Sequence, residues 1–266
     1  MRRGVRTSPL GGQEVGGPLY SLRVLQEGFN HPRADGSFHA DGSITLIRGG
    51  PITAVVDTGG PWARSHLLRL LARQGLSPDQ VTHVICTHGH SDHVGNVNLF
   101  PGADLLVGFD LSRGYGFYQP NPLVNGVPYV LHPGHLEVVP TPGHTMNHVS
   151  LVVRETTVGT VVVAGDLFEK EEDEEEWRAL SEDPTRQEKS RRWALEVADV
   201  IVPGHGPPFR VFREWGRGEA PWGDGGDDDD EGGEGPKGPG GVLGGGGRPE
   251  RGPKEELEVT PSGDRG

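Results

Sequence analysis

The chain has 266 residues, of which 44 are glycine and 23 are proline, and its formal net charge at pH 7 is −13. This acidic balance argues against strong non-specific binding to nucleic acid, which depends on clustered cations, but it leaves a nucleic-acid substrate open. The single cysteine, Cys86, excludes an internal disulfide, and no apolar stretch approaches the roughly 18 residues of a membrane span, so we expect a soluble protein without membrane contact.

Glycine, proline and charge divide the chain into three parts. Residues 214–266 hold 18 glycines, 6 prolines and 14 acidic residues, and few large apolar side chains, which predicts a disordered acidic tail. Residues 1–17 contain arginines but lack the apolar run of a secretory signal, so we expect a flexible N-terminus and a protein of the cytoplasm and nucleus. Residues 18–213 remain as one folded domain, whose excess negative charge lies in the acidic run 169–183.

Short β-branched runs, bounded by glycine, proline and aspartate, alternate with helical patterns along this domain. The sequence predicts strands at 20–25, 43–47, 52–56, 81–87, 104–107, 136–139, 149–153, 160–164 and 200–202, and helices at 63–74 and 184–197. Between them, Ser-Pro-Asp-Gln at 77–80 has the pattern of a capping box. This order of strands and helices predicts an α/β domain.

Four metal-competent side chains lie within six positions, directly after the predicted strand 81–87. They are His88, His90, Asp92 and His93. Imidazole and carboxylate groups suit zinc and similar divalent ions. Chance clustering explains this loop poorly, because the whole chain has only 12 histidines. The loop therefore predicts a metal site.

Three further metal-competent residues each follow a predicted strand. His144 lies in Thr-Pro-Gly-His, Asp166 in Ala-Gly-Asp and His205 in Pro-Gly-His-Gly. A sheet can bring side chains at the ends of its strands together, and flanking glycine and proline residues permit close backbone approach. We expect these three side chains to meet the histidine loop.

With Asp57 in Val-Val-Asp-Thr-Gly-Gly, these motifs resemble, in order and spacing, the five motifs of the metallo-β-lactamase superfamily over residues 44–206. The resemblance implies a four-layer αββα sandwich and a dinuclear site. It implies one ion held by His88, His90 and His144, a second held by Asp92, His93 and His205, and Asp166 as the bridge. It also implies that Asp57 braces the histidine loop from behind.

Such a pair of ions, about 3.5 to 4 Å apart, can hold a bridging hydroxide and stabilise a departing oxyanion. Asp92 and Asp166 are the expected catalytic carboxylates, because Asp92 can accept the proton of that water and Asp166 joins the two ions. Zinc is the expected metal at two ions per chain, although iron or manganese fits the same donor set.

The resemblance implies a near-minimal, single-domain member of the superfamily, because only 38 positions separate Asp166 from His205 and leave no room for a large inserted domain. Further stretches, among them 56–64, 161–169 and 202–211, resemble one vertebrate branch of the superfamily. That resemblance implies a homodimeric zinc endoribonuclease acting in cytoplasm and nucleus. Its implied substrate is single-stranded RNA, cut at phosphodiester bonds at the 3′ end of histone pre-messenger RNA.

Two other functions stay open at this point. A glyoxalase II-like hydrolase of thioesters or small esters needs the same metals but no long groove. A non-catalytic metal-binding protein, with partner contacts through the acidic segments, is the alternative from another class. Intact ligands in every motif argue against this last reading of the chain.

Some residues beside the motifs allow plainer expectations. Cys86 lies within an apolar strand and is expected to be a buried thiol. His148, four residues after His144, is expected at the surface. The segment 108–133 is rich in tyrosine and phenylalanine, and it predicts either a stacking surface for bases or a loop packed by its own aromatic side chains.

Overall fold

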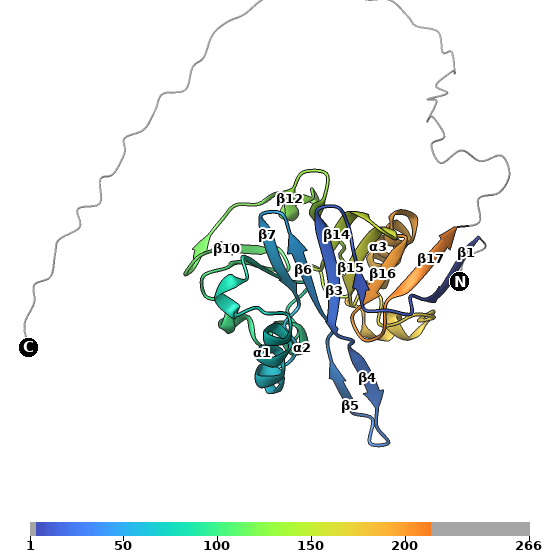
Figure 1. Cartoon of the computed structure of the whole chain (residues 1–266). Coiled ribbons are helices and arrows are strands. Elements are labelled where there is room, and N and C mark those ends of the chain that lie inside the picture. Colours follow the sequence, from blue (N-terminus) through green and yellow to red (C-terminus); the bar gives the residue numbers. More distant parts are fainter. Residues whose placement is uncertain (1–3, 214–266) are drawn as a thin grey trace, which may run out of the picture. The chain divides into compact units, whose positions relative to one another are not determined.

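Two large β-sheets pack face to face in the computed structural model, which describes residues 4–213 (Figure 1). Among these residues, one sheet has seven strands, in the spatial order β1 (Val5–Pro9), β17 (Phe209–Arg213), β16 (Val200–Pro203), β15 (Gly159–Gly165), β14 (Val149–Thr156), β13 (Leu136–Pro140) and β12 (Tyr129–His132). The expected tail at 214–266 lies outside the described residues.

The second sheet has eight strands within the described part of the chain. Their spatial order is β11 (Phe117–Tyr118), β10 (Asp110–Arg113), β9 (Asp104–Val107), β8 (His83–Cys86), β7 (Ile52–Val56), β6 (Ile44–Gly49), β3 (Tyr20–Gln26) and β2 (Glu14–Val15). The remaining strands, β4 (Phe29–Pro32) and β5 (Phe38–Asp41), pair as a separate hairpin that projects from the domain (Figure 1).

Side chains of β14 show how the strands hold the layers together. Val149, Leu151 and Val153 point into the core between the two sheets, whereas Val152 points to the outer face. Successive side chains of a strand alternate between faces, so the part of a strand that is covered on both sides is mostly apolar. Each such buried side chain contributes about 1.5 to 3 kcal/mol through removal of apolar area from water.

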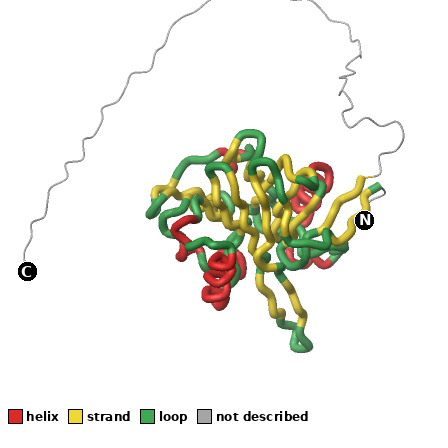
Figure 2. Tube along the Cα trace, in the orientation of Figure 1, coloured by secondary structure: helices red, strands yellow, loops and turns green. Residues whose placement is uncertain are grey.

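Helices cover the two outer faces, as Figure 2 shows. Leu67 and Leu71 of α1 (Arg64–Arg73) pack with Val55 of the eight-stranded sheet. Ala194 of α3 (Pro184–Val197) packs with Ile201 of the seven-stranded sheet. The short α2 (Ser91–Val94) carries part of the histidine loop. The expected αββα sandwich is therefore confirmed.

Short 3-10 turns join several of these elements. They are η1 (Pro61–Ala63), η2 (Pro78–Gln80), η3 (Val97–Leu99), η4 (Pro122–Asn125) and η5 (Glu176–Leu180). The predicted capping box is present at η2, where Ser77 and Gln80 cap each other. Within residues 4–213, no helix is long and apolar enough to cross a membrane.

The predicted strands and helices of the domain are all present, with ends shifted by a few residues. The N-terminus differs from expectation. We expected residues 1–17 to be flexible, but Val5–Pro9 pairs antiparallel with Phe209–Arg213, and Glu14–Val15 pairs with β3. These edge segments lack an alternating apolar pattern, so their order depends on partners that lie elsewhere in the sequence.

The central core allows a direct test of this packing. Replacement of the fully buried Leu151 by alanine is expected to lower the free energy of unfolding by about 2 to 5 kcal/mol, because it leaves a cavity between the sheets. Val124, which is 64% exposed, provides the control, and Val124→Ala should change stability by less than about 0.5 kcal/mol. Urea denaturation, with an unchanged m-value, measures the free energy of unfolding of both variants. Equal losses of stability in Leu151→Ala and Val124→Ala would contradict the assigned core.

Candidate metal centre

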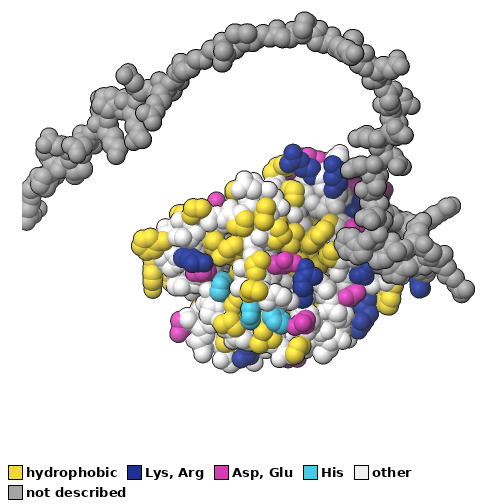
Figure 3. All heavy atoms as spheres, turned by 90° about the horizontal axis from the view of Figure 1, so that it is seen from above, with side chains coloured by type: hydrophobic (Ala, Val, Ile, Leu, Met, Phe, Trp, Pro, Cys, Tyr) yellow, Lys and Arg dark blue, Asp and Glu magenta, His cyan; other side chains and the backbone are white. Residues whose placement is uncertain are grey.

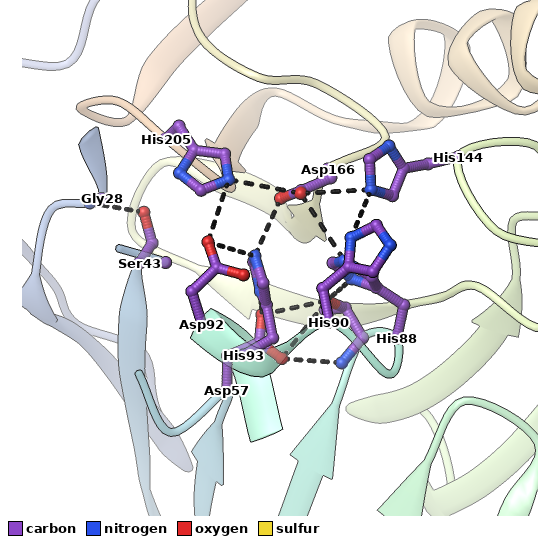
Figure 4. Close-up of polar contacts among 12 residues, drawn as sticks. Gly28, Ser43, Asp57, His88, His90, Asp92, His93, His144, Asp166 and His205 are labelled. Carbon is purple, nitrogen blue, oxygen red and sulfur yellow. Dashed lines mark hydrogen bonds and ion pairs between the residues drawn. The ribbon is translucent and has the colours of Figure 1, made fainter. Parts of the chain in front are cut away.

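All seven predicted ligands converge at the ends of strands, and their side chains face a common centre (Figure 4). Strands β7 and β8 are parallel neighbours, as are β15 and β16. The loops that follow parallel strands leave the sheet at the same edge, which brings their side chains together. The eight-stranded sheet supplies the 88–93 loop, and the seven-stranded sheet supplies His144, Asp166 and His205.

The first cluster contains His88, His90, His144 and Asp166. Oδ2 of Asp166 lies 3.6 Å from Nε2 of His88 and 3.3 Å from Nε2 of His144. Nε2 of His144 is also 3.1 Å from Nδ1 of His90. The four donor atoms lie close enough together to surround one ion, which is the set that the resemblance implies.

The second cluster contains Asp92, His93 and His205. Oδ2 of Asp92 lies 3.9 Å from Nε2 of His93 and 3.7 Å from Nε2 of His205. Asp166 reaches this cluster too, with 3.3 Å from its Oδ2 to Nε2 of His205 and 3.2 Å from its Oδ1 to Nε2 of His93. Asp166 thus lies between the clusters, and the bridging role that the resemblance implies for it stays a prediction.

The chemistry of these donors fits a divalent metal ion. Nε2 of His88, Nε2 of His93 and Oδ1 of Asp166 are buried and have no hydrogen-bond partner among the described residues. Buried polar atoms without a partner are costly, and imidazole with carboxylate is a donor set that zinc and similar ions accept. The residues present therefore fit a bound ion in each cluster.

Partners behind the imidazoles determine how they face the centre. Asp57, the predicted brace, accepts a hydrogen bond from Nδ1 of His93 at 2.9 Å and from the backbone N–H of Thr87 at 2.7 Å. Nδ1 of His205 lies 3.1 Å from the carbonyl oxygen of Phe29, which can only accept. These contacts place the proton on Nδ1 and leave Nε2 free to bind an ion.

Helix α3 holds the two loops of the seven-stranded sheet. Gln187 donates from Nε2 to the carbonyl oxygen of Asp166 at 3.0 Å, and Ser190 donates to that of Pro142 at 2.8 Å. Ser181, just before the helix, donates to the carbonyl oxygen of Gly143 at 2.9 Å. The helix therefore positions His144 and Asp166 relative to each other.

Close backbone approach explains a glycine beside the centre. A Cβ on Gly204 would lie 1.8 Å from Oδ1 of Asp166. A methyl group there would displace the shared carboxylate, so only glycine lets the His205 loop pass this close.

In the metal-free centre, protonated imidazoles supply the positive charge beside Asp166. Burial lowers the pKa of His205, but the Asp166 carboxylate outweighs burial and raises that pKa to about 9. Burial likewise opposes a charge on His93, yet Asp166 and Asp57 hold its pKa well above the usual value. The imidazoles in turn outweigh burial at Asp166 and keep the pKa of its carboxyl well below the usual value.

The sequence reasoning missed Glu169, which it counted only within the acidic run. Glu169 is 5% exposed and forms a third possible ligand group with Asp166 and His205. Burial and the neighbouring Asp166 raise the pKa of its carboxyl to about 8. The sequence held one signal for its burial, because Glu169 is three residues after Asp166 and directly follows the apolar Leu167 and Phe168.

The expectation that His148 lies at the surface is wrong. The side chain is fully buried, and its ring stacks on His88 with 5.3 Å between centroids. Burial and the neighbouring His144 lower its pKa to about 3, so it stays neutral. Cys86 is a buried thiol as expected, and burial followed by Asp57 raises its pKa well above the usual value.

Comparison with known proteins agrees with this geometry. Residues 40–104 match the family model of the metallo-beta-lactamase superfamily. The chain is 57% identical over 209 residues to metallo-beta-lactamase domain-containing protein 1 of Xenopus laevis, covering 78% of this chain and 89% of that protein. The chain belongs to the metallo-β-lactamase superfamily.

Two further matches agree with this assignment. The protein of the same name from Homo sapiens is 51% identical over 243 residues, covering 79% of this chain and 90% of that protein. The solved structure of AidC, a dizinc quorum-quenching lactonase, superposes with a TM-score of 0.53 at 17% identity, covering 80% of this chain and 98% of that chain. At this identity AidC supports the shared fold. The function class that follows is a metallo-β-lactamase family hydrolase with a divalent-metal site.

The approach of Gly204 to Asp166 predicts a metal-binding defect in this metallo-β-lactamase centre. Gly204→Ala is expected to weaken zinc binding by about 10-fold or more, since the added methyl group displaces a shared ligand. Gly89→Ala is the matched control in the histidine loop, because a Cβ there meets nothing within 4 Å. Chelator competition measures affinity; equal affinities in the two variants would contradict the placement of Asp166.

The raised pKa of His205 predicts how the stability of the metal-free protein depends on pH. Below the ordinary value of 6.5, both the folded and the unfolded histidine are protonated, and the full stabilisation is present. It is lost as the pH rises through about 9, by up to about 1.4 kcal/mol per pH unit for each such proton. His93 and Glu169 act with the same sign.

Urea unfolding in the presence of a chelator, between pH 6.5 and 9.5, measures this loss. The zinc-loaded protein is the control and should gain stability over part of the same range, because the ion competes with protons for the imidazoles. A metal-free protein whose stability rises with pH would contradict the assigned contacts of His205.

Proposed function

We propose that the protein is a dinuclear zinc hydrolase that cleaves phosphodiester bonds of single-stranded RNA, with the 3′ end of histone pre-messenger RNA as its substrate. The observation that carries this proposal is the position of Asp166, whose carboxylate lies within 3.6 Å of imidazoles from both ligand clusters. The stretches that resemble the vertebrate branch of the superfamily support the choice of substrate.

Zinc suits the ligand set, and iron or manganese suits it as well. When bound, two adjacent divalent ions supply Lewis acidity toward water and phosphoryl oxygens and compensate the charge of the leaving oxygen. Asp166, which lies close to imidazoles of both clusters, would fix their positions relative to each other. Asp92 has a side chain that is 18% exposed, and its Oδ2 faces both His93 and His205, so it can take up a proton at the mouth of the centre.

Exposed aromatic side chains support an RNA substrate. Tyr115, Phe117 and Tyr118 are each more than two-thirds exposed, so the alternative of a loop packed by its own aromatics is wrong for these three. Bases of single-stranded RNA stack on such side chains without regard to sequence. The vertebrate resemblance also supports a homodimer in cytoplasm and nucleus, which gel filtration and cell imaging test.

A second candidate is a hydrolase of thioesters or small esters, and the surface charge favours it. The excess negative charge of the domain lies in the acidic run 169–183, which begins beside the centre at Glu169. The face in Figure 3, on the side of the domain away from the histidine loop, carries Lys and Arg side chains interspersed with Asp and Glu. Met146, two residues after His144, adds an exposed apolar side chain. A small uncharged substrate needs no basic groove.

A substrate panel separates these functions. Protein of measured metal content is tested on a histone-type single-stranded RNA, on S-lactoylglutathione and on a β-lactam. We expect RNA cleavage, and we expect Asp166→Asn to lower it by more than the roughly 10- to 100-fold that loss of an outer partner causes. Asp110→Asn, at an exposed position of β10, is the matched control and should keep full activity.

Activity confined to the thioester would overturn the nuclease proposal in favour of the second candidate. Unchanged RNA cleavage by the Asp166→Asn variant would overturn the assigned centre. Two bound ions with no hydrolysis of any substrate would favour the non-catalytic binding role.

A further inference from the structure

The buried imidazoles of the centre follow one pattern, with a single exception among the described residues. Three have a partner on the nitrogen that faces away from the centre, at 3.1 Å for His88 and Thr87, 2.9 Å for His93 and Asp57, and 3.1 Å for His205 and Phe29. Nδ1 of His144 is buried and has none within the part of the chain that the structure describes. A ligating histidine almost always donates from its second nitrogen to an oxygen.

Glu169 is the acceptor that faces this nitrogen. Oε1 of Glu169 lies 3.9 Å from Nδ1 of His144, too far for a hydrogen bond but close enough for a small side-chain rotation to form one. Both carboxyl oxygens are buried, and neither has a hydrogen-bond partner in residues 4–213. Two complementary groups without partners therefore face each other beside the first ligand cluster.

The backbone keeps Glu169 in this place. Its carbonyl oxygen accepts from the N–H of His205 at 2.7 Å, and its own N–H donates to Oδ2 of Asp173 at 3.3 Å. Oε2 lies 4.0 Å from Nε2 of His205. One carboxyl group therefore lies within 4.0 Å of a histidine from each cluster.

The stability of the fold does not explain why a glutamate is buried at position 169. A carboxyl group buried without a hydrogen bond destabilises the folded state, and an apolar side chain of similar size would avoid that cost. A group that is unfavourable for the fold and directed at a ligand is better explained by the centre that it serves.

We propose that Glu169 is a positioning residue of the metal centre: its carboxylate accepts the Nδ1 proton of His144 and thereby presents Nε2 of His144 to the ion. The proposal rests on the metal site of the proposed function but not on RNA as the substrate. By analogy with Asp57 behind His93, each cluster then has one carboxylate that orients a histidine.

Zinc affinity of purified variants tests the proposal without any substrate. Glu169→Ala is expected to bind zinc about 10- to 100-fold more weakly than the wild type, because His144 loses its partner. Glu169→Gln keeps the shape and an amide oxygen that can accept the same proton, so a smaller loss is expected. Glu172→Gln is the matched control, since Glu172 is an exposed acid of the same run.

Nitrogen-15 NMR of histidine rings in the zinc-loaded protein gives a second readout that a merely structural role would not move. The Nδ1 proton of His144 should be protected from exchange in the wild type and in Glu169→Gln, and should be lost in Glu169→Ala. Urea unfolding of the metal-free variants separates folding from binding. Because the carboxyl group destabilises the fold, Glu169→Gln should not lower stability, and this variant still decides the matter if Glu169→Ala fails to fold.

If Glu169→Ala bound zinc as tightly as the wild type and kept a protected Nδ1 proton on His144, the role of Glu169 would be overturned. The proposed function would be unaffected. Equal losses in Glu169→Gln and Glu169→Ala would also overturn the role of Glu169 and would indicate that Glu169 binds the ion directly. If the wild-type protein bound no divalent ion, both this role and the proposed function would be overturned.

Discussion

The structure depends on one buried carboxylate. Asp166 lies among four imidazoles, with its oxygens 3.2 to 3.6 Å from nitrogens of His88, His93, His144 and His205. An isolated buried charge is very unfavourable, so this carboxylate requires positive charge around it, from protonated imidazoles or from bound cations. Hydrogen bonds from Gln187 and Ser190 to backbone carbonyl groups hold the Asp166 loop and the loop before His144 in place.

The same constraint joins the two sheets at one end. Asp166 and His205 come from the seven-stranded sheet, whereas the 88–93 loop comes from the eight-stranded sheet. Backbone hydrogen bonds reinforce the junction, including Ser43 N–H to the carbonyl oxygen of Gly204 at 2.8 Å. The centre is therefore placed where the layers meet, and its geometry follows from how the sheets pack.

The acidic charge of the domain limits how a polyanion could bind near the centre. Acidic side chains gather at and after Glu169, which lies beside His144 of the centre. Attraction for the proposed RNA substrate would therefore come mainly from cations bound at the centre, with exposed aromatic side chains adding contact that does not depend on charge. The proposed RNA substrate therefore requires the centre to bind phosphate, and small esters are the competing substrates.

The sequence by itself indicated the strands and helices from alternating apolar residues and caps, and singled out seven metal-competent residues at the ends of strands. The brace role of Asp57 and the division of the ligands between two ions came from the resemblance to the metallo-β-lactamase superfamily. The sequence could not show β1, whose order depends on pairing with β17, nor that His148 is buried against His88. Glu169 was hidden for the same reason: within an acidic run it looks like its exposed neighbours. Only the tertiary structure decided which of those acids lies beside His144, because burial and partners arise from contacts between residues far apart in the chain.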